Sequence, residues 1–252
     1  MRTFSIKDRP SHPAWAHPRP IGTVESGVVT ALPAAVLWDM DGTIIDTEPF
    51  WMDAETELIT SFGGTWSFDE AIQLAGQGLW HSARVLQSRG VDLTEMEIID
   101  SLTATVAQRV KSGGLPWRPG ARELLLELRA TDVRTALVTM SIGSLAHQVV
   151  DAIGFDAFDQ VVAGDDVEHS KPHPAPYLLA TKLLGVAPSD CVAIEDSPPG
   201  VASASAAGAT AIGVPLNLPL IEDGTFTVWP TLSGRSVADL AQVLASSKSG
   251  TR

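Results

Sequence analysis

Cysteine, basic residues and long apolar runs are scarce in this sequence. Cys191 is the only cysteine among 252 residues, so a disulfide within the chain is excluded, which fits a reducing compartment. The 17 Lys and Arg residues are outnumbered by 30 Asp and Glu residues, and the net charge of −13 repels nucleic acid and anionic lipid headgroups. No apolar run approaches the roughly 20 residues that a membrane span requires. We therefore expect a cytoplasmic protein, a monomer by default, that binds neither nucleic acid nor membranes.

Residues 1–33 differ in composition from the rest of the chain. They contain five prolines and more basic than acidic residues, whereas the whole chain is acidic. Proline lacks a backbone N–H and fixes its own φ, so regular structure is prevented over most of this stretch. We expect residues 1–33 to form a flexible N-terminal extension that carries no chemistry.

Residues 47–112 are predicted to be helical. Apolar residues recur with a spacing near 3.6 from 49 to 62, and helical stretches are also expected at about 68–75, 79–88 and 94–111. The continuous apolar run at 34–38, just before them, is typical of a buried parallel strand. The helices are therefore an insertion after the first strand, and we expect a helical cap domain at residues 47–114.

Beyond residue 115, strand and helix patterns alternate. This alternation predicts a doubly wound parallel sheet, because βαβ crossovers are right-handed and place helices on both faces. The predicted fold class is α/β, with a Rossmann-like core of residues 34–46 and 115–252 that carries the α-helical cap domain as an insertion. The expected helices are 121–130, 143–153, 174–184 and 199–207, and the expected strands are 134–139, 160–163, 191–194 and 210–214.

Two aspartates follow the first strand in the run Asp39-Met40-Asp41-Gly42-Thr43. Ligands of open parallel sheets bind beyond the carboxyl ends of the strands, and residues two apart on an extended segment point to the same side. Two ionised carboxylates held close together are costly unless a cation lies between them. The run therefore predicts a cation site, although an Asx-rich turn would also explain this cluster if it stood alone.

Thr139-Met140-Ser141 stands at the end of the next strand, just before a helix. A hydroxyl with backbone N–H groups at a helix N-terminus binds phosphate well, and a simple N-cap by Thr139 or Ser141 is the alternative. Lys171 precedes a proline-rich turn and a helix start. It is either a group that neutralises a phosphoryl oxygen or an ordinary surface lysine.

Glu195 and Asp196 follow the apolar strand at 191–194. Adjacent acidic residues at a buried strand end are costly without a partner, and Mg²⁺ prefers oxygen ligands. All four clusters stand at strand ends, and their agreement predicts a phosphate and Mg²⁺ site at one edge of the sheet.

In this order, DMDGT, a strand-end threonine, Lys-Pro and EDS resemble the four motifs of the haloacid dehalogenase superfamily, over about residues 34–214. The insertion after the first motif resembles the helical cap of the subgroup that includes sugar-phosphate phosphatases and β-phosphoglucomutase. The stretches DTEPFW, SKPHPAPYL and CVAIEDS are especially similar to hexose-phosphate phosphatases. The resemblance implies a Mg²⁺-dependent phosphatase that hydrolyses a small phosphorylated metabolite, a sugar phosphate, through an aspartyl phosphate.

The resemblance also implies a role for each motif residue. Asp39 would be the nucleophile, and Asp41 would protonate the leaving oxygen, help to activate water and turn its backbone carbonyl to the metal. Positioning and charge neutralisation are most of what phosphoryl transfer needs. The phosphate site would comprise Thr139, Met140, Ser141 and Lys171, of which Thr139 and Lys171 count as catalytic. The metal site would comprise Asp39, Asp41, Glu195 and Asp196.

Single features of the sequence distinguish phosphoryl transfer from other activities of the superfamily. Dehalogenases lack the second aspartate, so Asp41 favours phosphoryl transfer. Phosphonoacetaldehyde hydrolases form a Schiff base on a cap lysine, and residues 47–110 contain no lysine. A β-phosphoglucomutase-like mutase shares the core, differs in how the cap excludes water, and stays an alternative. A catalytically inactive binding protein on the same fold is a further alternative, which the complete set of required side chains disfavours.

The cap domain is expected to select the substrate, because the core contacts only the phosphoryl group. We expect His81 or Arg84 to meet a polar group of the sugar, and Glu48 at the hinge to face the cleft. Trp80 is interpreted as packed inside the cap domain. The candidate specificity residues are Glu48, Gly76, His81 and Arg84.

Overall fold

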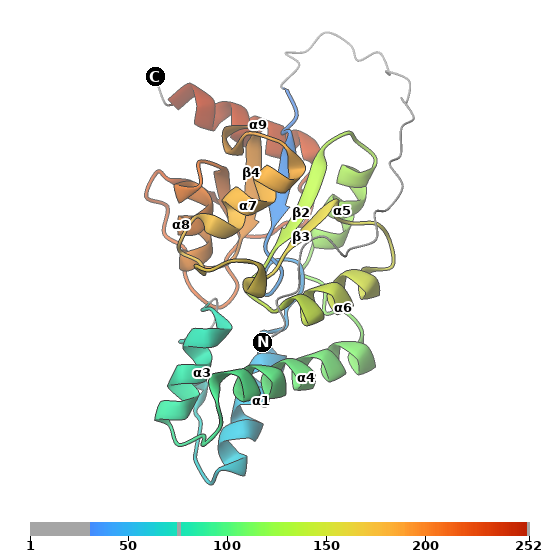
Figure 1. Cartoon of the computed structure of the whole chain (residues 1–252). Helices are drawn as coiled ribbons and strands as arrows, with labels where there is room; N and C mark the ends of the chain where they lie inside the picture. The colour runs from blue at the N-terminus through green and yellow to red at the C-terminus, as the bar shows by residue number, and fades with distance from the viewer. Residues whose placement is uncertain (1–30, 75–76, 251–252) are drawn as a thin grey trace.

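The computed structural model describes residues 31–74 and 77–250, and its centre is one sheet of six parallel strands in the order β3-β2-β1-β4-β5-β6 (Figure 1). The strands are β1 (Ala35–Trp38), β2 (Arg134–Val138), β3 (Gln160–Val162), β4 (Cys191–Glu195), β5 (Thr210–Gly213) and β6 (Phe226–Val228). The central strands β1 and β4 are buried along their whole length, as expected where both faces are covered. The predicted α/β fold with a parallel sheet is confirmed. Residues 1–30, most of the predicted N-terminal extension, lie outside the described part.

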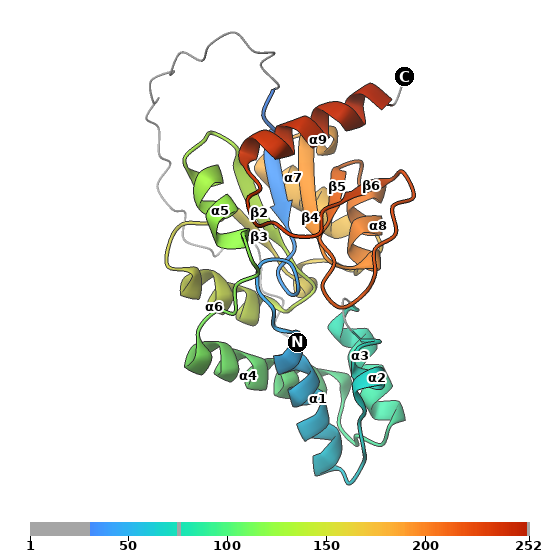
Figure 2. The same ribbon diagram turned by 180° about the vertical axis from the view of Figure 1, so that it is seen from behind.

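Helices cover both faces of the sheet. In Figure 1, α7 (Ala175–Leu184) and α8 (Pro198–Ala206) lie in front of the strands; in Figure 2, α5 (Ala121–Arg129) and α9 (Val237–Gly250) do. Alternate residues of β1 serve the two faces: Leu37 packs with the side chains of α7 and α8, and Trp38 with those of α5, α9 and α6 (Gly143–Ile153). None of the helices in the described part of the chain is long and apolar enough to cross a membrane.

Between β1 and β2 the chain forms a helical insertion, which lies beyond the carboxyl ends of the strands (Figure 1). It comprises α1 (Glu48–Ser61), α2 (Phe68–Ala71), α3 (Leu79–Ser88) and α4 (Glu95–Gly113). Capping boxes at Ser67 and Thr94 fix where α2 and α4 begin. Helix α4 packs against α1 and α3 and also against α6, so it joins the helical insertion to the core.

The chain enters and leaves the helical insertion at neighbouring points. The N–H of Asp46 donates to the carbonyl oxygen of Pro116 at 2.8 Å, and the N–H of Arg118 donates to that of Ile44 at 2.8 Å. These bonds hold the two crossings side by side. The domain boundaries at 46/47 and 114/115 stay predictions.

Three elements differ from the sequence predictions. The helix expected at 68–75 ends at Ala71, and the closely following glycines at 76 and 78 disfavour its continuation. The short strand β6 and the helix α9 are not predicted at all. β6 has only three residues, and α9 is rich in alanine and serine, which blurs its apolar stripe. The other predicted elements are confirmed to within two residues at their ends.

Candidate active site

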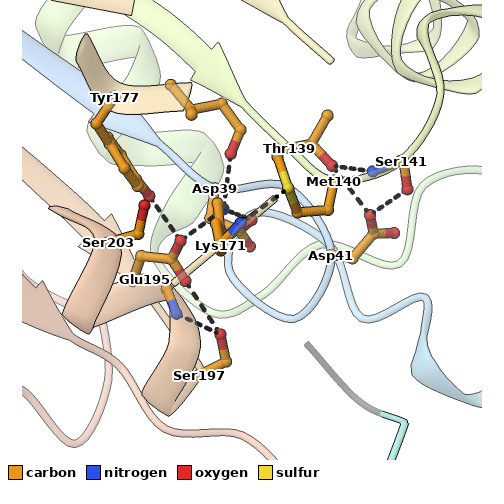
Figure 3. A network of polar contacts seen from close by, with 12 residues as sticks. Asp39, Asp41, Thr139, Met140, Ser141, Lys171, Tyr177, Glu195, Ser197 and Ser203 are labelled. Atoms are coloured by element: carbon orange, nitrogen blue, oxygen red, sulfur yellow. Dashed lines mark hydrogen bonds and ion pairs between the residues drawn. The ribbon is translucent and has the colours of Figure 1, made fainter. Parts of the chain in front are cut away.

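Polar side chains gather where the carboxyl ends of β1, β2 and β4 meet (Figure 3). Asp39 follows β1, and its N–H extends the sheet by donating to the carbonyl oxygen of Ile194 at 3.0 Å. Thr139 follows β2, and Glu195 is the last residue of β4. Asp39 is 7% exposed and Glu195 is fully buried. Such buried groups must be compensated by one another or by a ligand.

Lys171 compensates two of the buried carboxylates. Its Nζ donates to Asp39 Oδ1 at 2.7 Å, to Glu195 Oε1 at 2.6 Å and to the carbonyl oxygen of Val138 at 2.9 Å. An ammonium group has three N–H donors, so all of them are used. Burial alone would lower the pKa of Lys171, but Asp39 and Glu195 raise it above its usual value. Lys171 is therefore not the surface lysine of the alternative interpretation.

Glu195 is held by two hydroxyl groups besides Lys171. Tyr177 donates its O–H to Glu195 Oε1 at 2.6 Å, and Ser197 donates to Oε2 at 3.4 Å. Burial and the charge of Glu195 raise the pKa of Tyr177 well above its usual value, so the phenol stays a neutral donor. Tyr177 is the only tyrosine in the chain, and no sequence motif assigns it a role.

Three carboxylates, those of Asp39, Glu195 and Asp196, form a cluster suited to a divalent cation. One oxygen of each lies within 4.8 Å of the others, and Asp39 Oδ2 is buried without a hydrogen-bond partner among the described residues. Burial and then Glu195 raise the pKa of Asp39 to about 7, and burial and then Asp39 raise that of Asp196. A divalent cation would offset this desolvation and repulsion. The oxygen ligands match the preference of Mg²⁺.

Asp41 lies outside this cluster of carboxylates. Its side chain joins the core to the helical insertion. Its Oδ2 accepts from Ser141 Oγ at 2.7 Å and from Thr139 Oγ1 at 3.4 Å. Its Oδ1 accepts from Trp51 Nε1 at 3.2 Å and from the hydroxyl of Thr47. Trp51 belongs to α1, and Thr47 is its N-cap residue. The prediction that the backbone carbonyl of Asp41 faces the metal stays a prediction.

Thr139 and Ser141 do not cap α6. The N-cap of that helix is Ile142, whose side chain makes no capping hydrogen bond, and the N–H of Gly143 donates instead to Asp165 Oδ1 at 2.8 Å. The two hydroxyls face Asp41 instead, and the N–H of Ser141 donates to Thr139 Oγ1 at 3.0 Å. The sulfur of Met140 accepts from the N–H of Lys171 at 3.4 Å. The N-cap alternative is therefore wrong, and segment 139–141 lines the cavity described next.

A cavity of about 60 Å³ lies between this site and the helical insertion. Glu48 lines it, as expected, and so do Trp51, Met52 and Glu55 of the same helix. Burial and then Asp41 raise the pKa of Glu48 to about 8. Burial raises the pKa of Glu55 to about 7, against the hydrogen bond that Trp66 donates to it.

Sequence analysis did not single out Glu55, Trp51 or Met52, although a pattern could have found them. Positions 48, 51, 52 and 55 recur at the spacing that places residues on one helix face. This face of α1 carries two carboxylates beside apolar side chains, which is costly in a purely structural core.

The structure does not bring His81 or Arg84 to the cavity. Helix α3 presents Leu79 and Ser82, three residues apart on one face, and this leaves the two predicted side chains on other faces. Arg84 Nη1 pairs with Glu95 Oε2 at 3.2 Å on the surface. The expected contact of either residue with a sugar therefore has no support in this arrangement.

Trp80 and Gly76 stand close to the start of α3 in the sequence. Trp80 is 39% exposed, so its interpretation as a packed residue is wrong; it lies off the face that carries Leu79 and Ser82. Gly76 lies outside the described residues.

Gly42 leaves no room for a side chain next to Asp196. Its φ is +84°, and a Cβ would overlap the Asp196 carboxylate. We expect Gly42→Ala to displace that carboxylate and to weaken Mg²⁺ binding at least about tenfold in a calorimetric titration without substrate. Gly63→Ala is the matched control, because Gly63 has a φ of +77° and nothing within 4 Å of the added Cβ. Equal Mg²⁺ affinities in the two variants would contradict this role of Gly42.

Glu55 makes the stability of the fold depend on pH. Its pKa is about 7 in the folded state against a usual 4.5, so between these values the folded protein holds more protons than the unfolded one. The free energy of unfolding therefore falls as the pH rises through this range, by up to about 3 kcal/mol. Glutamine still accepts from Trp66 but does not titrate. We expect Glu55→Gln to be about 1–3 kcal/mol more stable than the wild type at pH 8, with a smaller gain at pH 5, in urea unfolding. An equal gain at both pH values would rule out this linkage.

The arrangement of these groups agrees with the family to which the sequence is matched. A buried aspartate after β1 is bound to a lysine and lies beside an acidic pair at the end of β4. The family model for haloacid dehalogenase-like hydrolases matches residues 33–208. The chain belongs to this family, and the resemblance stated from the motifs is confirmed.

Individual relatives fall in the same family. Fructose-1-phosphate phosphatase YqaB of Escherichia coli K12 is 32% identical over 187 residues, which cover 73% of this chain and 97% of YqaB. Phosphorylated carbohydrates phosphatase of Thermotoga maritima is 32% identical over 181 residues, covering 69% and 81%. The crystal structure of CbbY from Rhodobacter sphaeroides with phosphate has a TM-score of 0.76 at 28% identity, covering 83% and 99%. A CbbY mutant in complex with xylulose-(1,5)bisphosphate gives the same values. The prediction of a phosphatase is thereby confirmed.

Proposed function

We propose that this protein is a Mg²⁺-dependent phosphatase that hydrolyses the phosphate monoester of a small carbohydrate through an aspartyl phosphate. The orientation of Asp39 carries the proposal. This residue lines the cavity with one oxygen fixed by Lys171 at 2.7 Å and the other buried without a hydrogen-bond partner among the described residues. A carboxylate held in this way is suited to attack phosphorus. The relatives named as carbohydrate phosphatases support this class of substrate.

The reaction has two displacements at phosphorus. In the first, an oxygen of Asp39 bonds to phosphorus while the bond from phosphorus to the ester oxygen breaks, and Asp41 gives a proton to the leaving oxygen. In the second, water bonds to phosphorus while the Asp39–phosphate bond breaks, and Asp41 takes a proton from that water. Inorganic phosphate and an alcohol leave, and both aspartates return to their first state. Two easier displacements thus replace one difficult one.

The phosphoryl oxygens are held by groups that donate to carboxylates in the structure. The hydroxyls of Thr139 and Ser141 now donate to Asp41, and Lys171 donates to Asp39. A bound phosphoryl group takes over part of this hydrogen bonding. Because the donors are already positioned, binding needs little reorganisation.

Mg²⁺ would be held by Asp39, Glu195 and Asp196, with the carbonyl oxygen of Asp41 as a further ligand. When bound, Mg²⁺ neutralises negative charge on the phosphoryl group and on its carboxylate ligands. Tyr177 and Lys171 orient Glu195 through their hydrogen bonds, so they position this ligand for the metal.

Residues 47–114 act as a cap domain in this proposal. Trp51, Met52, Leu74 and Leu79 present apolar surface to the cavity. Closure over a bound ester excludes bulk water from the leaving group, and opening admits the substrate. The hydrogen-bonded crossings at Asp46 and Pro116 are the point about which this movement occurs.

The test is the release of inorganic phosphate from a panel of sugar phosphates and nucleotides, with Mg²⁺ and with a chelator. We expect metal-dependent turnover of at least one hexose or pentose phosphate. Isomerisation of β-glucose 1-phosphate without phosphate release would overturn the proposal in favour of a mutase. Binding of phosphate esters with neither reaction would favour the inactive binding protein.

A further inference from the structure

The cavity above the phosphoryl site has a strongly one-sided charge. Lys171 is the only cationic side chain among the described residues that line it. The three N–H groups of its ammonium already serve Asp39, Glu195 and a backbone carbonyl. The carboxyl side chains that line the cavity are Asp39, Asp41, Glu48, Glu55 and Asp196.

The arginines of the helical insertion are engaged elsewhere. Arg84 pairs with Glu95, Arg89 pairs with Glu70, and Arg109 pairs with two carboxylates of α1, all on the surface. None of these arginines lines the cavity. The helical insertion therefore offers a leaving group hydroxyl-binding and apolar side chains, without a positive charge from the described residues.

Arg118 lies closer to the site but also does not line the cavity. Its Nη2 donates to the carbonyl oxygens of Val214 at 3.3 Å and Pro215 at 3.2 Å. The guanidinium thus ties the second crossing to the loop after β5. Its charge acts on that of Asp196, but its side chain is not among those that line the cavity.

We infer that the substrate's leaving group is an uncharged polyol, so that the protein hydrolyses monophosphates of neutral sugars or sugar alcohols and discriminates against bisphosphates and carboxylated phosphates. This inference rests on the proposed phosphatase function and narrows its substrate class. A second anionic group would lose its hydration in the cavity and meet no cation in return. It would also face Glu48 and Glu55.

Glu55 is the residue best placed to bind a hydroxyl of the leaving group. Trp66 Nε1 donates to its Oε2 at 3.1 Å and fixes the carboxyl group at the cavity wall. A carboxylate accepts from a sugar hydroxyl, and a protonated carboxyl donates to one, so either state binds a polyol. Protonation removes the repulsion of an anion but supplies no cation to compensate it.

The same charge pattern disfavours the mutase alternative. A mutase that keeps its phosphoryl group on Asp39 must return it to a second hydroxyl of a sugar monophosphate. The intermediate is then necessarily a bisphosphate, whose distal phosphate would lie against the helical insertion. The described residues of the cavity wall provide no cation there.

The experiment compares kcat/KM for two matched pairs of esters at pH 8 with Mg²⁺. Fructose 1-phosphate and fructose 1,6-bisphosphate differ by one phosphate, and glucitol 6-phosphate and 6-phosphogluconate differ by one carboxylate. We expect the neutral member of each pair to be preferred at least about 100-fold. A bisphosphate hydrolysed within about tenfold of its neutral partner would overturn the inference. The comparison with a bisphosphate is the more demanding of the two, because a similar protein, a CbbY mutant, was crystallised with a bisphosphate.

Failure of the proposed function is distinguishable from failure of this inference, because it abolishes hydrolysis of every ester. If no ester is hydrolysed, the phosphatase proposal fails, and calorimetric Kd values of the same pairs for the wild-type protein decide the inference. A Kd at least about tenfold lower for the neutral member supports it, and equal Kd values overturn it.

Glu55→Gln tests the specificity-determining residue itself. We expect the preference for fructose 1-phosphate over the bisphosphate to fall about tenfold in this variant. The control is Glu57→Gln on the same helix, because Glu57 pairs with Arg109 on the surface and does not line the cavity. The preference should stay within about twofold of the wild type in the control. An unchanged preference in Glu55→Gln would remove Glu55 from the inference, since a ratio of two substrates is insensitive to the fraction of folded protein.

Discussion

Replacing Asp39 by asparagine is expected to lower kcat at least about 10⁴-fold on the best sugar phosphate. The amide is a poor nucleophile, but its oxygen still accepts from Lys171, so the local fold should persist. Phosphate release measures the loss. Acid quenching with ³²P-labelled substrate should trap label on the wild-type protein and none on Asp39→Asn.

Asp132→Asn is the control, since Asp132 is exposed in the turn between α5 and β2, at the opposite end of the strands. Its kcat should match that of the wild type. If Asp39→Asn lost only about tenfold, direct attack by water would be indicated, and the covalent intermediate would be abandoned.

Replacing Lys171 by methionine is expected to abolish turnover and to destabilise the fold by about 3–5 kcal/mol in chelator. The change leaves Asp39 and Glu195 buried together without their shared cation. Mg²⁺ supplies positive charge to the same carboxylates, so it should recover part of the lost stability. Urea unfolding with Mg²⁺ and with chelator measures both effects.

Lys182→Met is the matched control for this prediction. Lys182 lies exposed in the last turn of α7 and is expected to change stability by less than about 1 kcal/mol. A Lys171→Met protein as stable as this control in chelator would show that Asp39 and Glu195 do not depend on the lysine.

The sequence predicts the core of the site because parallel strands place their carboxyl ends at one edge. Asp39, Thr139 and Glu195 are far apart in the chain. The alternation of strands with helices gives a parallel sheet, and this alone brings them together. Their exact partners are less predictable. That Lys171 would bridge Asp39 and Glu195 depends on the path of a loop, which no periodicity encodes.

The helical insertion shows where prediction from the sequence ends. Periodicity identifies α3 but does not fix which of its faces meets the core, since that depends on how α3 and α1 pack on α4. Arg84 and His81 therefore attract attention by residue type, whereas Glu55 is the residue that lines the cavity. Tyr177 illustrates the same limit in the core, because a helical tyrosine in an apolar stretch is ordinarily a packing residue.

The single tyrosine has a practical consequence for spectroscopy. Tyr177 donates to Glu195, one of the carboxylates suited to hold Mg²⁺. Protein labelled with ¹³C-tyrosine should therefore give one set of ring resonances, and these come from a group hydrogen-bonded to one of those carboxylates. The chain thus contains its own NMR reporter, which should follow the binding of a cation to these carboxylates without an added probe.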